Sequence, residues 1–402
     1  FSTGESAVAP FRWAAATIPF AALAFAYMGA TRGLKIMRFT LYSQWIAQPI
    51  GWIAFTLAFW AILDDTPAPA SAAFAASWAL ALAIAWYGWE KEQARFPDVR
   101  PAPGAARGEE IPEERTSALV RFGALRAPAT LFSQLIFWTD FFVLSLLWSD
   151  QGPVGAATTG VYGAVLRAGQ SLFLFLTSVS LTFSPFVADL HHRGEHERLD
   201  GLYQQVTRWT LAATVPVLLV LAVLPGPVLR IFGAEFVAGE TALRILIVGM
   251  IVPVMVGTVG FILIMAGRTG WDLVVYAGGF AIDVALALAL ARPESLGIEG
   301  AAIAQAATLT VSAIARLMLV RRFLGIWPFD AGYLRLAPAA VVGGVAMALA
   351  HAAMPAERWL LDLLVSFAVG GVVYAVALLA VGLPRRERTA LFAMAGRVLR
   401  RG

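Results

Sequence analysis

The chain of 402 residues is 59% hydrophobic and only 14% charged, with a mean hydropathy of +0.73. Soluble domains are about 45–50% apolar and about 25% charged, so this composition excludes both an ordinary soluble protein and an intrinsically disordered one. The net charge is +4 and there is no cysteine, which excludes disulfides, iron–sulfur clusters and zinc–thiolate sites.

Apolar runs long enough to cross a bilayer recur along the whole chain. They are apolar on all faces, which favours helices over the alternating ten-residue strands of a β-barrel. We therefore predict an all-α polytopic membrane protein with about eleven transmembrane helices in two bundles. The predicted spans are 13–28, 41–63, 71–89, 131–148, 158–186, 209–224, 242–266, 273–291, 301–320, 337–351 and 359–381.

The segment 90–117 after the third predicted span is rich in proline and in charged residues. This composition is typical of a linker, so it divides three helices from the eight that follow. Lys and Arg concentrate in the loops after odd-numbered spans, which places the C-terminus in the cytoplasm by the positive-inside rule. Arg121 and Arg126 precede the fourth span, where we expect them to anchor it at the cytoplasmic surface, with anionic headgroups as an alternative contact.

Three charged residues fall deep inside predicted spans, where charge is costly and therefore informative: Asp140, Arg167 and Asp283. Asp140 and Arg167 lie about 12 and 14 Å from the same end of two neighbouring antiparallel helices, at 1.5 Å per residue. We expect the two to pair, or both to line a polar cavity. The alternatives are a structural ion pair and a substrate-binding arginine, since a guanidinium suits a diphosphate.

Other polar residues suggest a cavity on the same helices. Tyr162 and Gln170 accompany Arg167 on the fifth predicted span, either as cavity lining or as interhelical hydrogen bonds. Asp283 in the eighth span is a candidate coupling site, or else a protonated structural residue that Gln305 hydrogen-bonds. Arg316 lies near the cytoplasmic end of the ninth span, where its side chain could extend to the interface.

Motifs of enzymes do not occur in the sequence. A Walker A pattern, GxSxG and HExxH are all missing. The three histidines between 191 and 196 have no set of co-ligands at metal-binding spacing, so we expect a solvated loop. We therefore predict a carrier that is not an enzyme, with no catalytic residues, metal or cofactor.

Five segments between 122 and 324 form a recognisable series: TDFFVLSLL, VYGAVLRAGQ, SPFVADLHHRGEHERLDGLYQQVTRW, PGPVLRIFGAEFVAGETALRIL and GIEGAAIAQA. In order and spacing they resemble the C-terminal half of the MOP superfamily in its polysaccharide-transporter branch, which includes Wzx-type flippases. The preceding segment ATIPFAALAFAYMGATRGLK resembles the fourth helix of the same family's N-terminal lobe.

The resemblance implies two helical lobes and a division of the chain into the five parts given below. It also implies three further helices before residue 1. It also implies alternating access that moves an undecaprenyl-diphosphate-linked oligosaccharide across the inner membrane, for O-antigen or exopolysaccharide biosynthesis, with Arg167 facing the cavity. The implied parts are 1–89 (end of the N-terminal lobe), 90–117 (cytoplasmic linker), 118–324 (C-terminal lobe of six helices), 325–384 (two additional helices) and 385–402 (basic cytoplasmic tail).

The expected partners are the lipid-linked oligosaccharide, membrane lipids, and glycosyltransferases and a polymerase of the same pathway, with no nucleic acid and a monomeric chain. Two other functions stay open at this point. A MATE-like, cation-coupled exporter of small molecules would favour intramembrane acids over arginine. A membrane-embedded glycosyltransferase or polymerase would need acidic or histidine catalytic groups near one face, usually beside a large outer loop.

Overall fold

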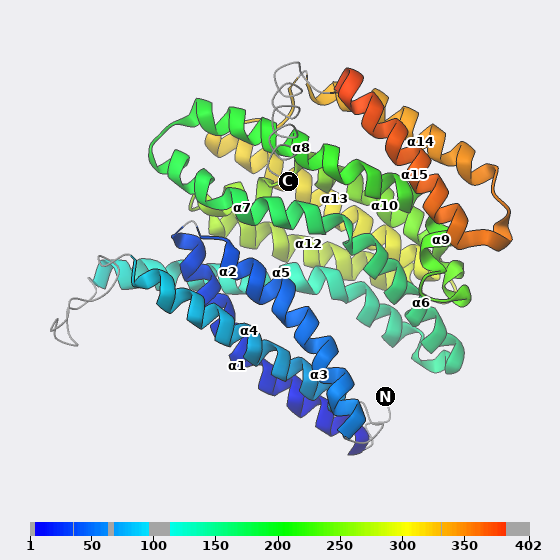
Figure 1. Ribbon diagram of the computed structural model, residues 1–402, viewed down its shortest axis with the longest axis horizontal. Coiled ribbons are helices and arrows are strands. Elements are labelled where there is room, and N and C mark those ends of the chain that lie inside the picture. The colour runs from blue at the N-terminus through cyan, green and yellow to red at the C-terminus, as the bar shows by residue number, and fades with distance from the viewer. Residues whose placement is uncertain (1–4, 35, 63–67, 96–112, 331, 383–402) are drawn as a thin grey trace, which may run out of the picture. The chain divides into compact units, whose positions relative to one another are not determined.

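The computed structural model describes residues 5–34, 36–62, 68–95, 113–330 and 332–382. Across these ranges the regular structure is helical, with no strand, and ten helical segments are long and apolar enough to cross a membrane (Figure 1). The protein is therefore an all-α, multi-pass membrane protein, as its composition predicts. Much of the predicted linker and the basic tail lie outside the described residues.

The chain forms two compact units, Phe1–Glu113 and Glu114–Gly402, which we describe separately. The first unit contains α1 (Glu5–Gly33), α2 (Arg38–Thr40), the π-helix η1 (Leu41–Ala47), α3 (Gln48–Ile62) and α4 (Ala68–Gln93). The second contains α5 (Glu113–Leu147), η3 (Ser149–Gln151), α6 (Pro153–Gln170), α7 (Leu172–His192), α8 (His196–Val223), α9 (Pro225–Leu229), η4 (Ala234–Gly239), α10 (Glu240–Val256), α11 (Val259–Met265), α12 (Thr269–Leu290), α13 (Gly297–Leu324), η5 (Tyr333–Arg335), α14 (Leu336–Ala352), η6 (Ala356–Arg358), α15 (Trp359–Ala377) and η7 (Leu378–Gly382). The ends of the predicted linker are thus helical, since α4 continues past residue 90 and α5 begins before residue 117.

In the first unit, α4 packs against both α1 and α3. Small residues line the contact: Ala24 and Ala85 are fully buried beside Met28. A Cβ atom on Gly88 would lie 2.4 Å from the ring of Phe39, so only glycine leaves room for that ring. Close approach through small residues is the usual way that membrane helices associate, because apolar burial alone does not drive them together.

The π-helix η1 joins α2 directly to α3. It ends beside Pro49, which has no backbone N–H and whose ring crowds the carbonyl of Trp45. The chain widens here, because the N–H of Gln48 donates to the carbonyl oxygen of Ser43, five residues earlier. The proline is thereby accommodated inside a continuous span.

In the second unit, α13 packs against both α10 and α12 (Figure 1). Glycines bring their backbones into contact. A Cβ on Gly249 would lie 2.2 Å from the Cβ of Ala306, and a Cβ on Gly300 would lie 1.9 Å from the carbonyl oxygen of Leu290. The facing surfaces of α12 and α13 are therefore held at a fixed separation, which positions the polar residues described below.

The expected fifth span, 158–186, is divided into α6 and α7 at Ser171, and neither helix is among the ten described candidate spans. The N–H of Ser171 donates to Ala168 at 3.2 Å and that of Leu174 donates to Ser171 at 3.3 Å, so the ladder tightens to three-residue steps there. Gly169 and Ser171 lie two residues apart at this break, and glycine together with serine is a common cause of such a bend.

The expected seventh span, 242–266, is also interrupted, at Gly257 between α10 and α11. Gly257 has φ of +64°, in the left-handed region, and a Cβ there would lie 2.9 Å from the side chain of Thr207. Both facts require glycine at this position. The interruption opens the wall of a cavity inside the second unit.

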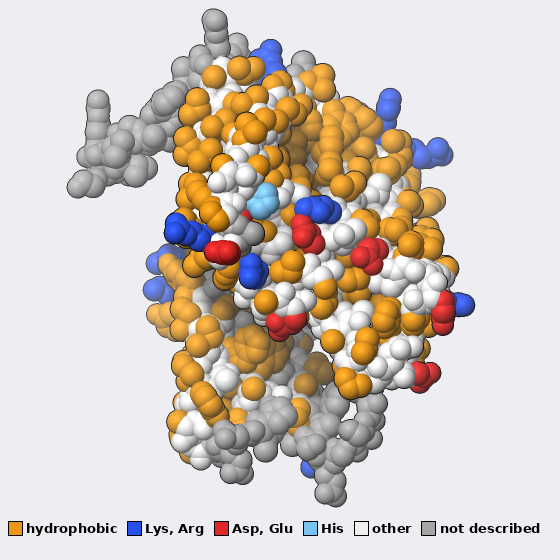
Figure 2. Space-filling view, turned by 90° about the vertical axis from the view of Figure 1, so that its right-hand side faces the viewer, with side chains coloured by type: hydrophobic (Ala, Val, Ile, Leu, Met, Phe, Trp, Pro, Cys, Tyr) orange, Lys and Arg blue, Asp and Glu red, His pale blue; other side chains and the backbone are white. Residues whose placement is uncertain are grey.

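Apolar side chains are exposed on many of these helices, and Figure 2 shows hydrophobic surface above and below a band where most of the acidic and basic side chains in this view lie. On α14 and α15, for example, Leu349, Leu364 and Val372 are more than half exposed. A soluble protein would bury such side chains, whereas lipid solvates them.

Candidate functional site

A cluster of buried polar residues lies inside the second unit, and we call it the acid cluster: Asp140, Tyr162, Asp283, Gln305 and Thr308. All five are fully buried, and they come from α5, α6, α12 and α13. The hydroxyl of Tyr162 lies 3.3 Å from Asp140 Oδ2 and 3.4 Å from Gln305 Oε1. One phenol thus bridges a carboxyl group on α5 and an amide on α13.

The spacing of polar residues along α12 and α13 explains how these side chains meet. On α12 they recur at 272, 276 and 283, and on α13 at 305, 308, 312 and 316. Steps of three or four residues, or multiples of them, keep side chains on one helix face. The two stripes face each other, since a Cβ on Gly279 would lie 2.6 Å from Ser312 Oγ.

The acid cluster contains more acceptors than donors. Asp140 and Asp283 lie close enough to interact electrostatically, and no described ion pair joins either carboxyl group to a basic residue. Asp140 Oδ1 has no hydrogen-bond partner among the described residues, and the carboxyl group of Asp283 lies beside the hydroxyl group of Thr308. Two carboxylates in one low-dielectric site repel each other, so the arrangement suits a bound proton or monovalent cation.

Arg167 lies elsewhere, in what we call the Arg167 pocket, a cavity of about 290 Å³ that Gln170 also lines. Its guanidinium carbon lies 5.1 Å from the ring centre of Trp138, a cation–π contact, and the side chain is exposed. The other lining residues are mostly aromatic or small: Phe141, Gly163, Ala164, Leu166, Phe232 and Phe236.

The expected pairing of Asp140 with Arg167, or their sharing of one cavity, is therefore wrong. Asp140 meets Tyr162, and five residues separate Tyr162 from Arg167 on α6. At 100° per residue the two side chains diverge by about 140°, so Arg167 projects from another face of the helix. Matching depth along two helices did not place their side chains on facing sides.

The predicted site residues thus fall into two groups. Asp140, Tyr162 and Asp283 belong to the acid cluster, whereas Arg167 and Gln170 line the Arg167 pocket. Gln305 does not hydrogen-bond Asp283 as expected, because its Oε1 faces the hydroxyl of Tyr162. The charged neighbour of Asp283 in this cluster is Asp140, which lies too far away in the sequence to be recognised as a neighbour without the structure.

Sequence reasoning also missed an ion cluster at the beginning of α12. Asp272, which is fully buried, contacts Arg126 Nη1 through Oδ2 at 2.9 Å and Arg316 Nε through Oδ1 at 3.3 Å. The side chain of Arg316 is only 13% exposed and stacks 3.9 Å from the ring centre of Tyr276, so it turns inward instead of extending to the interface. The polar stripes on α12 and α13 are the signal that could have revealed it.

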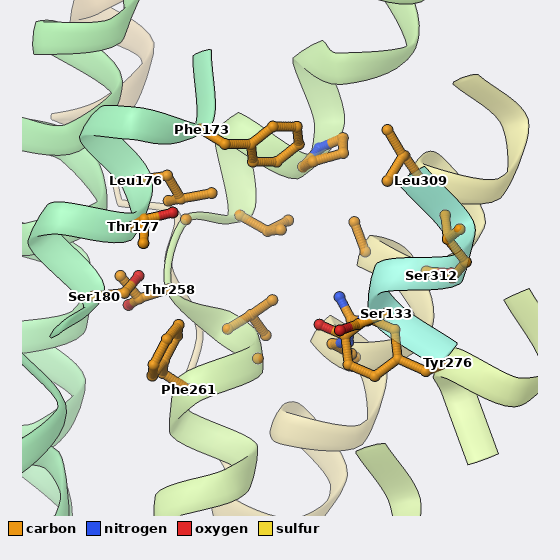
Figure 3. Close-up of a pocket in the computed structure, with 18 of the residues that line it drawn as sticks. Ser133, Phe173, Leu176, Thr177, Ser180, Thr258, Phe261, Tyr276, Leu309 and Ser312 are labelled. Atoms are coloured by element: carbon orange, nitrogen blue, oxygen red, sulfur yellow. The ribbon is translucent and has the colours of Figure 1, made fainter. Parts of the chain in front are cut away.

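A cavity of about 200 Å³ adjoins this ion cluster, and we call it the Arg316 cavity. Hydroxyl groups lie on both sides of it: Thr177, Ser180 and Thr258 on one, and Ser133, Tyr276 and Ser312 on the other (Figure 3). The segment around Gly257, where α10 gives way to α11, forms part of its wall. Arg316 is the one charged residue among the described residues that line it.

Comparison of the chain with models of known protein families and with curated proteins found no match.

Proposed function

We propose that the protein is a flippase, which carries an undecaprenyl-diphosphate-linked oligosaccharide across the inner membrane by alternating access. The observation that supports transport is the acid cluster, because ionisable groups buried inside membrane helices mark routes of ions or substrates. The substrate class rests on the sequence resemblance between 122 and 324. In this role the protein delivers the substrate for O-antigen or exopolysaccharide assembly and acts beside glycosyltransferases and a polymerase. Its C-terminus lies in the cytoplasm in this proposal.

The acid cluster supplies the energy coupling in this proposal. A proton or monovalent cation held between Asp140 and Asp283 removes their mutual repulsion, and its release restores it. The two carboxyl groups are on α5 and α12, so their repulsion acts directly on the packing of these helices. Binding and release of the cation therefore favour different helix arrangements, as alternating access requires.

The Arg167 pocket contributes to the substrate site. A guanidinium can donate paired hydrogen bonds to a diphosphate even while its face stacks on Trp138. Phe232 and Phe236 present apolar surface to the rest of the ligand, and Gln170 can hydrogen-bond sugar hydroxyl groups.

The second candidate is a MATE-like exporter of small molecules, driven by a proton or sodium gradient. The specific observation in its favour is the same carboxyl pair, since that class depends on intramembrane acids more than on arginine. The two candidates differ in substrate and agree on coupling, so an experiment must identify the ligand directly.

Native mass spectrometry of the protein, purified from the membranes of its own host in mild detergent, tests the substrate. A flippase retains a mass equal to a polyprenyl diphosphate with sugars, and Arg167→Ala loses that mass. Arg322→Ala, the same substitution at an exposed position of α13, keeps it. Retention of a small cationic compound in place of the lipid would refute the flippase and favour the exporter.

Proteoliposome transport tests the coupling. Asp283→Asn and Asp140→Asn should each abolish the dependence of transport on a proton or sodium gradient, whereas Asp150→Asn, in an exposed turn, should not. Gradient-dependent transport that survives both core substitutions would exclude the acid cluster as the coupling site.

A further inference from the structure

The Arg316 cavity carries more positive charge than its surroundings neutralise. Arg126 and Arg316 both contact Asp272, so two guanidinium groups share one carboxylate. The side chain of Arg316 is 13% exposed and that of Asp272 is 1% exposed, so water screens the contact between these two poorly. The side chain of Arg126 is 32% exposed and is partly solvated. An excess positive charge in such a place is costly unless an anion accompanies it.

The hydrogen-bonding groups of the cavity are also unfilled. Arg316 Nε faces Asp272 Oδ1 at 3.3 Å, whereas Arg316 Nη2 has no hydrogen-bond partner among the described residues. The same holds for the hydroxyl groups of Ser312 and Thr258, which line the same cavity. Buried donors that stay unpaired cost about 1–3 kcal/mol each, so the cavity favours an acceptor-rich occupant.

The fixed orientation of Arg316 adds specificity. Its guanidinium stacks on Tyr276 at 3.9 Å while Nε faces Asp272, which leaves Nη2 available to a ligand. Figure 3 shows the hydroxyl-bearing residues Ser312 and Thr258 on opposite sides of the open space. A volume of about 200 Å³ far exceeds the 10–15 Å³ that one water molecule needs.

We propose that the Arg316 cavity binds a phosphate group, with Arg316 as its charged ligand and the hydroxyl groups of Ser312 and Thr258 as further donors. A phosphate supplies several acceptor oxygens and at least one negative charge, which matches both the unfilled donors and the excess charge. The group belongs either to a lipid headgroup or to a free phosphate. The site lies within the second unit and is separate from the Arg167 pocket.

Equilibrium dialysis of the purified protein with labelled inorganic phosphate and pyrophosphate tests the free ligand. Native mass spectra of the same protein in phosphatidylcholine nanodiscs, with and without phosphatidylglycerol, test the headgroup. We expect one saturable site, filled by the free anions or by the anionic lipid, and the arm that fills it identifies the source. A protein that binds neither the free anions nor either phospholipid would overturn the proposal.

Variants place the ligand. Arg316→Gln should weaken binding at least tenfold, and Arg316→Lys should recover part of it. Ser312→Ala and Thr258→Val remove only hydroxyl groups without partners, so they should fold normally and still weaken binding several-fold. Arg322→Gln, the matched loss of charge on α13 outside the cavity lining, should bind like the unaltered protein. Equal binding by the two hydroxyl variants and the unaltered protein would overturn the assignment to this cavity.

These measurements report binding without transport, so the result is independent of the proposed function. A protein that binds phosphate in this cavity but retains no lipid-linked oligosaccharide would keep the inference and refute the flippase. The reverse result would keep the flippase and refute the inference.

Discussion

Asp272→Asn is the substitution that most directly tests the packing of the second unit. The side chain is fully buried and accepts contacts from Arg126 at 2.9 Å and Arg316 at 3.3 Å. Asparagine keeps the shape but removes the charge, so both guanidinium groups lose their counterion. Removing one partner of a buried ion pair costs about 3–5 kcal/mol, because the other charge stays buried and uncompensated.

The structure also ranks the two arginine partners. The side chain of Arg126 is 32% exposed, so water screens its contact, and Arg126→Gln should cost about 1 kcal/mol. The side chain of Arg316 is 13% exposed and also stacks on Tyr276, so Arg316→Gln should cost more, about 2–3 kcal/mol. The expected order of destabilisation is Asp272→Asn, then Arg316→Gln, then Arg126→Gln.

Thermal unfolding of the purified protein in one detergent, followed by tryptophan fluorescence, measures this order. A loss of about 3 kcal/mol lowers Tm by roughly 6–12 °C in a domain of this size class. Asp150→Asn, in an exposed turn, is the matched control and should stay within about 2 °C. The reasoning is refuted if Arg126→Gln destabilises as much as Asp272→Asn, or if Asp272→Asn melts with the unaltered protein.

Three further predictions concern separate parts of the second unit. Tyr162→Phe removes a buried hydroxyl that makes two long contacts, of 3.3 and 3.4 Å, and should lower the free energy of unfolding by about 1 kcal/mol in the same melting assay; no change would show that the contacts contribute nothing. Gly300→Ala would place a Cβ 1.9 Å from a carbonyl oxygen of α12 and should lower the free energy of unfolding by more than about 2 kcal/mol. Gly278→Ala, with open space around it, should be neutral or stabilising, and equal melting of these two variants would contradict the close packing. Burial and the nearby charge of His196 lower the pKa of His191 below 6.5. As pH falls, the unfolded chain therefore takes up a proton before the folded protein does, and stability decreases below about pH 6.5. His191→Gln should flatten the dependence of Tm on pH between about pH 8 and 5, and an unchanged pH profile would exclude this residue as the cause.

The acid cluster shows which parts of a buried site the sequence can predict and which parts it cannot. Asp140 and Asp283 are identifiable as intramembrane acids from hydropathy alone, and the stripe of polar residues on α13 follows from helical spacing. Their meeting depends on which faces of α5, α12 and α13 pack together. That choice rests on close contacts such as Gly300 against Leu290, which no single segment encodes.

Arg167 shows the limit of such reasoning. The rise of a helix gives the distance of Arg167 along its axis, but it carries no information on rotation about that axis. The angle of about 140° from Tyr162 directs it toward Trp138 and away from Asp140. From its place near the end of a span, Arg316 could have extended to the interface. Its partner Asp272 lies 44 residues earlier in the sequence, so helical spacing did not reveal the contact.

Composition and hydropathy by themselves determined that this protein is helical and crosses a membrane many times, because each span must be apolar and must satisfy its own backbone hydrogen bonds. They could not reveal the break at Gly257, since an apolar run looks the same whether its helix continues or bends. Tertiary structure alone decided which charges meet, because the free energy of a buried charge depends on neighbours that are distant in sequence. The acid cluster and the Arg316 cavity both arise from that packing.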